Sequence, residues 1–460
     1  MALLVILSAS LLTTSLSDEG SVQIELIAWA WLLAALLSCI AAFAQFFGVD
    51  ASLKGFVAPS VAHQAYANLR QKNLFSTLVA IGLCALVWLW GRHAHRHALA
   101  LRAAGAMLCA GLAVSASRTG FVELFVLVAL YACWHRTSAR ALRWVGFAGI
   151  AYVAAAAAFA LWQTTGAGDV APLLRRLLGD APDCLGRRVL WSTIVELLRA
   201  HPWVGIGWGD MPYAVFTSPH EPHFCAIVEN AHNLPLHLAA ELGLPIAIGF
   251  IVLAARAIAG ARPLAESDDT RRLGWAVLAV LGVHSLLEYP LWYGPFEIAA
   301  GLAAGLVMRG RAQLELPRAV PAVLAALVLI ASATAALDYA RVSQLFMAPQ
   351  ARWARWRQSP FERLGHPMIF RRQADFARLV TLPVTPQTAD DVLALTDELM
   401  HLSPEPRVIE RRLQSELLLG RKADALRDFA LYKANFPAEA TVWLSGHPEL
   451  ELAPIKLPGG

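Results

Sequence analysis

Long apolar runs follow one another along the first three quarters of the chain, separated by short polar segments. A helix that crosses a membrane needs ~20 mostly apolar residues, and ten runs approach that length. They occupy residues 1–16, 24–47, 74–90, 97–115, 120–134, 144–163, 233–256, 273–288, 294–308 and 319–338. The pattern predicts an all-α fold, a polytopic membrane helix bundle of about ten spans.

From Tyr339 onward charged residues become frequent, and apolar residues recur with a helical period. We expect a helix capped by Thr385 or Thr388, a second starting after Pro404 and a third ending at Pro437. The two prolines are 33 residues apart, close to the period of a tetratricopeptide unit. The alternative is an all-helical soluble cap without a repeat.

Composition agrees with a membrane protein. Of the 460 residues, 57% are apolar and 16% charged, whereas a soluble chain has about 45–50% and about 25%. These shares exclude a disordered chain and an ordinary soluble enzyme. The net charge of +4 is small for this length, so we infer no nucleic-acid partner. The expected domains are a transmembrane domain over 1–338, with a long loop at 164–232, and a helical domain over 339–460.

Arginines mark alternate loops between the predicted spans, and such basic loops normally face the cytoplasm. They are Arg92, Arg96, Arg102, Arg136, Arg140, Arg143, Arg256, Arg262, Arg271, Arg272, Arg309, Arg311 and Arg318. The opposite, periplasmic side then holds the 164–232 loop and everything after residue 338.

Three further arginines fall on the periplasmic side, against the usual bias. Arg70 precedes the third predicted span, Arg118 lies between the fourth and fifth, and Arg187 lies in the long loop. Guanidinium groups bind phosphate oxygens through two hydrogen bonds. The alternative for each arginine is an interfacial residue paired with lipid phosphate or a local carboxylate.

His232 stands where the long loop re-enters the membrane, and His is the natural general base near neutral pH. Glu229 and Asn233 are candidates to orient it. The alternative is a His that only hydrogen-bonds at a helix end. Glu288 and Tyr289, in another periplasmic turn, either line the same cavity or belong to an aromatic belt.

A metal site is the weaker interpretation of this loop. His220, Glu221 and His223 could join His232 around zinc, but the loop is Pro-rich and lacks a helical H-x-x-x-H spacing. No CxxC occurs either, so we expect no metal and no cofactor. Cys184 and Cys225 share the loop and either form a disulfide in an oxidising periplasm or remain free thiols.

Several motifs together resemble a known superfamily. Ser-Arg-Thr-Gly at 117–120, Arg187-x-x-x-Trp191, His201-Pro-Trp-x-Gly-x-Gly207 and Ala231-His-Asn233 are similar to the O-antigen ligase and polymerase superfamily. Asn68-Leu-Arg-Gln-x-Asn73 and Glu288-Tyr-Pro-Leu-Trp-Tyr293 resemble bacterial protein O-oligosaccharyltransferases of the pilin-glycosylation type. The resemblance covers roughly residues 60–310 and implies about two more spans upstream.

The resemblance implies a multi-pass glycosyltransferase of the bacterial inner membrane, with a periplasmic active site and a periplasmic C-terminal domain. The donor would be an oligosaccharide on undecaprenyl diphosphate, and the acceptor a Ser or Thr hydroxyl of a protein such as pilin. Transfer would be metal-independent and inverting, with His232 as base and Arg70, Arg118 and Arg187 on the diphosphate.

Two alternatives stay open. The same residues would serve ligation of O-antigen to lipid A–core, or polymerisation of glycan repeats, because only the acceptor differs. The second alternative is a non-catalytic transporter of a lipid-linked glycan, which would place its charges near the bilayer midplane. The charges here gather at the ends of predicted helices, which favours an enzyme.

Overall fold

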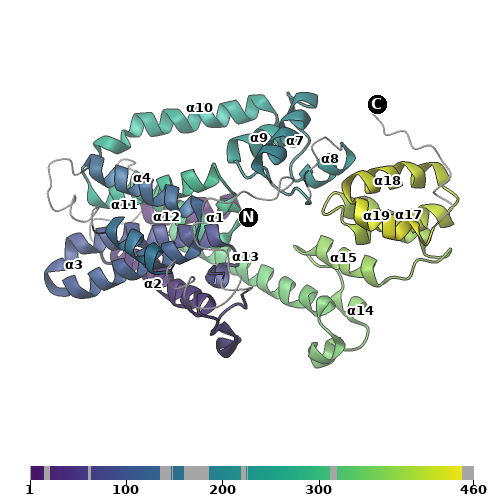
Figure 1. Cartoon of the computed structure of the whole chain (residues 1–460), viewed down its shortest axis with the longest axis horizontal. Coiled ribbons are helices and arrows are strands. Elements are labelled where there is room, and N and C mark those ends of the chain that lie inside the picture. Colours follow the sequence, from purple (N-terminus) through teal and green to yellow (C-terminus); the bar gives the residue numbers. More distant parts are fainter. Residues whose placement is uncertain are drawn as a thin grey trace. The chain divides into compact units, whose positions relative to one another are not determined.

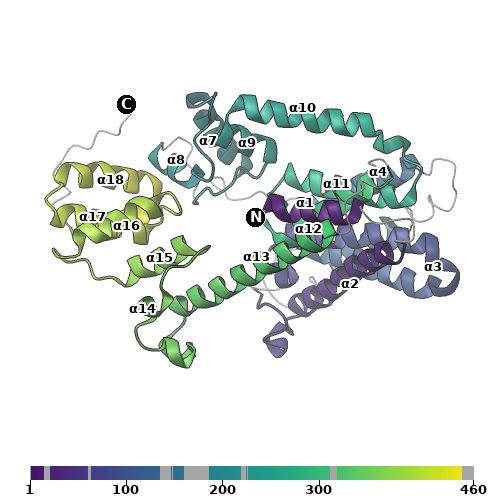
Figure 2. The same cartoon turned by 180° about the vertical axis from the view of Figure 1, so that it is seen from behind.

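The chain is helical throughout the residues that the computed structural model describes. These are 2–14, 21–60, 64–134, 147, 149–159, 186–218, 224, 226–310 and 319–447. Within these ranges no β-strand occurs, which confirms the predicted all-α class. The chain forms two compact units (Figure 1; Figure 2), residues 1–179 with 253–328 and residues 180–252 with 329–460. The predicted domain boundary at residue 338 stays a prediction.

The first unit is a bundle of apolar helices. They are α1 (Ala2–Thr14), α2 (Ser21–Phe46), α3 (Lys72–Ser115), α4 (Arg118–Trp134), α11 (Asp269–Ser285) and α12 (Gly294–Met308), with a further helix at Gly149–Phe159. Single 3₁₀ turns lie at Asp50–Leu53, Ala67–Leu69, Pro263–Ala265 and Pro290–Trp292. Helix α2 packs along α3, α1 packs on α12, and α11 contacts α3, α4 and α12.

Helix α3 doubles back on itself at His97, whose φ of −126° and ψ of 26° interrupt the helix. A Cβ added to Gly82 would lie 3.6 Å from Leu108, and one added to Gly111 would lie 3.5 Å from Phe75. In a straight helix, residues 75 and 111 would be ~54 Å apart at 1.5 Å per residue. The two arms are therefore antiparallel, and they correspond to the predicted spans 74–90 and 97–115.

Small residues allow the helices of this unit to approach closely. A Cβ on Gly82 would lie 2.4 Å from Ala35, and one on Gly111 would lie 2.4 Å from Cys39. A Cβ on Gly301 would lie 2.5 Å from the Ile6 carbonyl oxygen. Such close backbone packing is typical of helices in membranes, where dispersion contacts replace the hydrophobic effect between helices.

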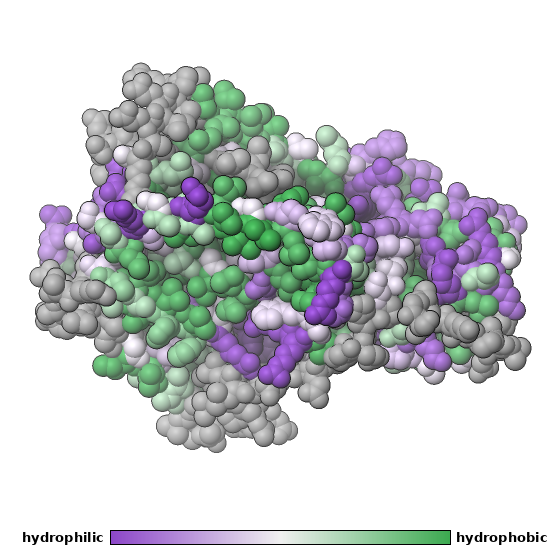
Figure 3. All heavy atoms as spheres, turned by 90° about the horizontal axis from the view of Figure 1, so that it is seen from above, coloured by the Kyte–Doolittle hydropathy of each residue, from purple (hydrophilic) through white to green (hydrophobic). Residues whose placement is uncertain are grey.

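Four helices in the described part of the chain are long and apolar enough to cross a membrane. They are Val22–Phe46, Lys72–Ser115, Leu244–Ala265 and Ala326–Phe346, and two shorter apolar helices lie at Gly149–Phe159 and Gly294–Met308. In Figure 3, hydrophobic side chains cover much of the visible face of the first unit, and hydrophilic ones gather over the C-terminal helices. A membrane protein is thus supported, while the count of ten spans stays a prediction.

The second unit contains residues 180–232 of the segment that the sequence predicted as one long loop, together with the C-terminal helices. Its helices are α7 (Arg187–Ala200), α8 (Met211–Thr217), α9 (Leu234–Leu242), α14 (Pro360–Leu364), α15 (Arg371–Thr381), α16 (Ala389–Met400), α17 (Pro406–Leu418), α18 (Lys422–Asn435) and α19 (Pro437–Leu444). Helices α10 (Leu244–Ala261) and α13 (Ala319–Ser343) belong partly to each unit. Single 3₁₀ turns lie at Gln344–Phe346, Pro349–Ala351 and Ala354–Trp356.

The predicted span 233–256 was wrong as a single helix, because it breaks at Gly243. This residue has a φ of +84°, and a Cβ on it would lie 2.2 Å from the Trp203 carbonyl oxygen. Only glycine tolerates both the backbone conformation and the close approach. The break separates the short helix α9, which follows His232, from the membrane-length helix that begins at Leu244.

The three amphipathic C-terminal helices are confirmed as α16, α17 and α18. Thr388 precedes α16 as predicted, but its hydroxyl makes no cap bond to the helix and accepts instead from the Thr385 amide at 3.0 Å. The turn after α17 ends at Gly420, which has a φ of +72°. The sequence pattern did not predict α19. The tetratricopeptide resemblance stays a prediction.

One arginine joins three of these helices. Arg412 on α17 donates to Asp428 of α18 at 2.6 Å, bonds Asp397 of α16, and lies 3.3 Å from Glu416. Glu416 is only 1% exposed. Burial, together with the nearby Asp428 carboxylate, raises the pKa of Glu416 to about 8.

We predict that Glu416 makes the stability of this unit depend on pH. The folded state keeps a proton on Glu416 up to about pH 8, whereas the unfolded chain releases it near the ordinary value of 4.5. The free energy of unfolding should therefore fall as pH rises through this window. Glu416→Gln, which stays neutral, should unfold at a higher temperature than wild type at the upper end of the window and show a flatter pH response.

Thermal unfolding of the full chain in detergent measures this effect. Glu398→Gln is the control, because the Glu398 side chain is 44% exposed on the neighbouring helix α16. Identical pH responses of wild type and Glu416→Gln would contradict the prediction.

Candidate functional site

The predicted site residues are divided between the two units. Arg70, Arg118, Glu288 and Tyr289 belong to the first unit, and Arg187, Glu229, His232 and Asn233 to the second. Within each unit the residues come from separate motifs, and hydrogen bonds between these motifs build a local site.

In the second unit, hydrogen bonds define the backbone around His232. The Asn230 side chain accepts from the His232 amide at 3.0 Å, and the Asn233 side chain caps α9 by accepting from the Leu236 amide at 3.0 Å. His232 itself has a φ of +50°, a conformation that costs a non-glycine residue about 1–3 kcal/mol. Such strain persists only where neighbours enforce it, and it gathers at functional sites.

Trp191 ties the His232 segment to the helix that carries Arg187. Its indole Nε1 donates to the Ala231 carbonyl at 3.0 Å. Arg187 is the first residue of α7 and lies four residues before Trp191, on the same helix face. Arg188 points about 100° away around the helix axis. Both arginines are exposed, so the preference for Arg187 stays a prediction.

The glycines of the 201–207 motif allow this segment to lie against α9. The Ile206 amide donates to the Ala240 carbonyl at 2.9 Å, and the Gly207 amide donates to the Glu241 carbonyl at 3.1 Å. A Cβ on Gly205 would lie 2.4 Å from the Glu241 carbonyl carbon. The motif therefore packs against α9, and this close backbone contact requires its glycines.

The same contact buries two ionisable side chains on α9. His237 and Glu241 are each 2% exposed, and Nε2 of His237 lies 3.4 Å from the Glu241 carboxylate. The His ring packs edge-on against Trp208, with the ring centroids 6.1 Å apart. Sequence reasoning assigned no role to this pair. The four-residue spacing was the available signal, but only the tertiary structure shows that both are buried.

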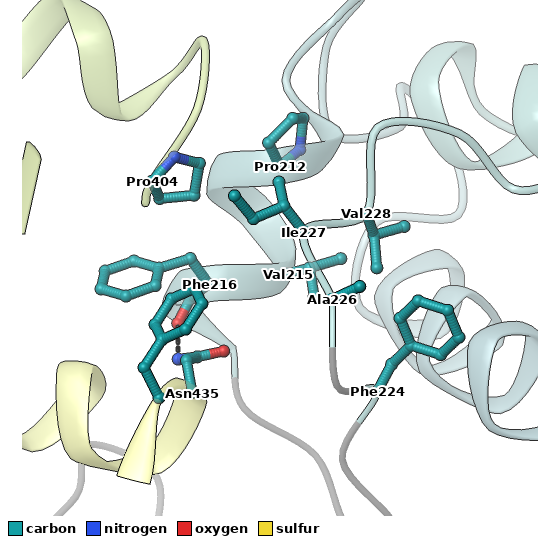
Figure 4. Close-up of a pocket in the computed structure, with 10 residues that line it drawn as sticks. Pro212, Val215, Phe216, Phe224, Ala226, Ile227, Val228, Pro404 and Asn435 are labelled. Atoms are coloured by element: carbon teal, nitrogen blue, oxygen red, sulfur yellow. Dashed lines mark hydrogen bonds between the residues drawn. The ribbon is translucent and has the colours of Figure 1, made fainter. Parts of the chain in front are cut away.

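Residues that lead into the His232 segment line a small groove against the C-terminal helices (Figure 4). Val228, Phe216 and Pro404 form parts of its wall, and the Asn435 amide donates to the Phe216 carbonyl at 2.9 Å. The groove has a volume of about 20 Å³, which is room for about one water. It is a packing contact that attaches α8 to α18 and is too small for a substrate.

In the first unit, Gln45 holds the segment that leads to Arg70. This side chain is fully buried, and its amide donates to the carbonyls of Ala58 and Ala67 at 2.8 and 3.0 Å. Its carbonyl oxygen accepts from the amides of Tyr66 and Ala67 at 3.0 and 2.7 Å. Arg70 follows with a φ of +57°. Sequence reasoning missed Gln45, because nothing local distinguishes it from a glutamine at a helix end.

Asn73 joins three of the motifs on which the resemblance depends. Its side-chain amide donates to Glu288 at 3.0 Å, and its carbonyl oxygen accepts from the Ser117 hydroxyl at 2.7 Å. Ser117 in turn accepts from the Gly120 amide at 3.0 Å and so caps α4. Since Asn73 follows Arg70 and Ser117 precedes Arg118, these bonds bring the two arginine-bearing turns together.

Arg118 is exposed among buried neighbours. Ser117 and Thr119 are each 2% exposed, and Ala116 has a φ of +49°. Arg118 is also the first residue of α4, as Arg187 is of α7. A cation at a helix N-terminus is unfavourable, because the helix dipole is positive there. Both positions favour a bound anion, which would accept from the guanidinium and interact favourably with the positive end of the helix dipole.

The turn at Glu288 has a carboxylate and an aromatic cluster. Glu288 is 6% exposed and bonded to Asn73, so it orients this amide. Tyr289 stacks on Tyr293 with a centroid distance of 5.9 Å and contacts Trp292 edge-on at 6.4 Å. The aromatic residues thus form one cluster beside the arginine-bearing turns.

Within the described ranges no group of three His, Cys, Asp or Glu residues is placed to hold a metal ion. The alternative zinc set of His220, Glu221 and His223 lies outside the described residues, and so do Cys184 and Cys225. Those two hypotheses stay predictions.

Three family models match regions of the chain that contain these motifs. The chain matches the family described as protein glycosylation ligase over residues 65–90, O-antigen ligase over 103–251, and virulence factor membrane-bound polymerase, C-terminal, over 272–449. The predicted resemblance is confirmed, because regions of the chain match the O-antigen ligase and protein glycosylation ligase families. These matches support the class of a membrane glycosyltransferase of this type.

Among individual proteins, the chain is similar to the general O-oligosaccharyltransferase of Acinetobacter baylyi (strain ATCC 33305 / BD413 / ADP1). The two are 24% identical over 283 residues, which cover 60% of this chain and 48% of that protein. The chain thus spans about half the length of this curated relative.

Proposed function

We propose that the protein transfers an oligosaccharide from an undecaprenyl-diphosphate carrier to Ser or Thr hydroxyls of periplasmic proteins, with inversion and without a metal ion. The observation that carries this proposal is the Asn73 bridge, which brings together the turns of Arg70 and Arg118. Two guanidinium groups on adjoining turns suit the oxygens of a diphosphate.

The arginines act on the leaving group. As the glycosidic bond breaks, its electron pair goes to the diphosphate oxygen, and the growing negative charge is stabilised by Arg70, Arg118 and Arg187. The N-termini of α4 and α7 add partial positive charge at Arg118 and Arg187. An arginine at the positive end of a helix dipole is repelled by it, which costs free energy in the free protein. A bound anion offsets this repulsion.

His232 acts on the acceptor. A hydroxyl is a poor nucleophile until a base removes its proton, and His232 accepts that proton as the hydroxyl oxygen bonds the anomeric carbon. Attack comes from the face opposite the diphosphate, so the anomeric configuration inverts. Asn230 and Trp191 are positioning residues, since they bind the amide and the carbonyl of the Ala231–His232 peptide, just before the imidazole, while Glu229 and Asn233 flank His232 in the chain.

The sequence comparisons favour a protein acceptor over lipid A–core. The relative with sequence similarity is named an O-oligosaccharyltransferase, and the 65–90 match is to protein glycosylation ligases. Ligation to lipid A–core or glycan polymerisation is the second candidate, supported by the matches at 103–251 and 272–449. Co-expression with a lipid-linked glycan pathway distinguishes them, because glycan appears on a protein such as pilin, on lipid A or on longer glycan chains.

Location follows from the same chemistry. A lipid-linked donor of this kind is used at the periplasmic face of the inner membrane, and the distribution of basic loops favours that face for His232 and the C-terminal helices. A transporter of the lipid-linked glycan is the third candidate, and it would show translocation without covalent transfer.

The first prediction concerns the base. His232→Ala should lower transfer by about 10²–10⁴-fold, the usual contribution of a general base, while abundance and membrane insertion stay near wild type. Glycan transfer to a co-expressed acceptor measures it, and His366→Ala, at an exposed His of the C-terminal region, is the control. Transfer at the wild-type rate by His232→Ala would remove this role.

The second prediction concerns the diphosphate. Arg118→Ala and Arg187→Ala should raise the KM for the lipid-linked donor, and lysine at either position should rescue only partly because it lacks the planar fork. Arg188→Ala is the matched control, an exposed arginine next to Arg187. If Arg188→Ala is inactive and Arg187→Ala is active, the assignment of Arg187 to the diphosphate is wrong. If all three alanine variants behave as wild type, the arginines are interfacial residues.

The third prediction concerns orientation. An alkaline phosphatase fused after Leu345 should be active, because that enzyme works only in the periplasm, and a fusion after Ala265 should be inactive. The reverse result would place His232 in the cytoplasm and contradict the lipid-linked donor.

A further inference from the structure

A fully buried polar cluster lies in the first unit beneath the arginine-bearing turns. Thr77, Glu123 and His284 are each 0% exposed, and they come from three helices, α3, α4 and α11. The Thr77 hydroxyl donates to the Glu123 carboxylate at 2.6 Å and also contacts Nδ1 of His284. The same His nitrogen lies 3.4 Å from Glu123. We call Thr77, Glu123 and His284 the inner triad.

Burial makes the inner triad a costly way to stabilise the packing of three helices. Replacing a buried ionisable pair by apolar residues is often neutral or stabilising, because desolvation offsets the attraction. Here Oε2 of Glu123 and Nε2 of His284 are buried and make no hydrogen bond with the described residues. Each buried polar atom without a hydrogen bond lowers the free energy of unfolding by roughly 1–3 kcal/mol. An apolar core would hold the three helices together at lower cost, so the triad has another role.

Each member of the inner triad lies one helical turn beneath the layer that carries the arginines. Thr77 is four residues after Asn73, and its hydroxyl oxygen lies 3.0 Å from the Asn73 backbone carbonyl oxygen. His284 is four residues before Glu288, and its carbonyl accepts from the Glu288 amide at 2.7 Å. Glu123 lies in the turn of α4 that follows Arg118 and Thr119. The triad thus fixes how α3, α4 and α11 are rotated and shifted along their axes relative to one another. It does so one turn from the segments that carry Asn73, Ser117 and Glu288.

We propose that Thr77, Glu123 and His284 are positioning residues that hold the Arg118 turn in register for the diphosphate. This inference rests on the proposed function and deepens it. Displacing a catalytic group by about 1 Å can cost about 10²-fold in rate, so a lower layer that prevents sliding between helices preserves the geometry of the upper layer. The triad touches neither the donor nor the acceptor.

The test separates positioning from folding. Thr77→Val keeps the shape of the side chain and removes the hydroxyl that joins the triad, and Glu123→Ala removes its carboxylate. Each should raise the KM for the lipid-linked donor by about tenfold or more, the scale of one to two lost hydrogen bonds, with an unchanged KM for the acceptor. Thr77→Ser, which keeps the hydroxyl, should restore the wild-type value.

Ser285→Ala is the matched control. Ser285 is the neighbour of His284 on α11, is 6% exposed, and donates its hydroxyl to the Leu281 carbonyl at 2.8 Å. Ser285→Ala removes a buried hydroxyl, as Thr77→Val does, but Ser285 lies outside the inner triad. We expect its donor KM and abundance to match wild type.

A double-mutant cycle tests the route of the effect. In an Arg118→Ala background Thr77→Val should cause no further rise in donor KM, because the group it positions is gone. In an Arg187→Ala background the full effect should remain. Additive losses with Arg118→Ala would overturn the proposal, and so would equal rises in both KM values or a loss of abundance in both Thr77→Val and Glu123→Ala.

Binding of undecaprenyl diphosphate to the purified full chain separates this inference from the proposed function. If the wild-type chain does not bind this probe, the proposed function fails. If wild type binds it and Thr77→Val binds equally well, the positioning role is wrong and the proposed function stands. Weaker binding by Thr77→Val, with Ser285→Ala unchanged, supports both.

Discussion

One half-buried amide side chain, with two buried polar partners, joins three segments of the first unit. Asn73 receives the Ser117 hydroxyl and donates to Glu288, so three chain segments far apart in sequence are fixed by two hydrogen bonds. Left unpaired in such surroundings, each of these polar groups would cost several times the net stabilisation of a hydrogen bond in water. That penalty makes the arrangement specific, because an alternative packing of these helix ends leaves polar atoms without partners. Arg70 and Arg118 adjoin this bridge, so their backbone positions follow from it.

In the second unit, close backbone contacts fix the position of the site residues. Its backbone segments approach each other closely at Gly205 and Gly243, and Trp191 bonds the carbonyl just before His232. His232 is left in a left-handed conformation, half-buried, next to the end of a helix. In both units, strained backbone and helix N-termini carry the ionisable residues, and buried neighbours on regular helices maintain the strain.

The matched regions contain the residues of the Asn73 bridge. The matches at 65–90 and 103–251 contain Asn73 and the Ser117–Gly120 turn, and the 272–449 match contains Glu288. These are the segments that the Asn73 bridge connects. Similarity to an O-oligosaccharyltransferase over about half of that protein's length supports the proposed transfer to protein, while the acceptor and the carrier are matters for the experiments above.

The sequence by itself determined the helical class, the membrane character and the motifs. Runs of apolar residues exceed what a soluble core accommodates, and motif residues such as Arg118 and His232 stand out by type and spacing. The bonds among those motifs were not predictable, since partners such as Asn73 and Glu288 are 215 residues apart. Periodicity also could not show that α3 doubles back at His97 or that one apolar run breaks at Gly243. Only the tertiary structure decided these points, because they depend on backbone contacts between distant segments, and the burial of Gln45 and Glu123 follows from the same packing.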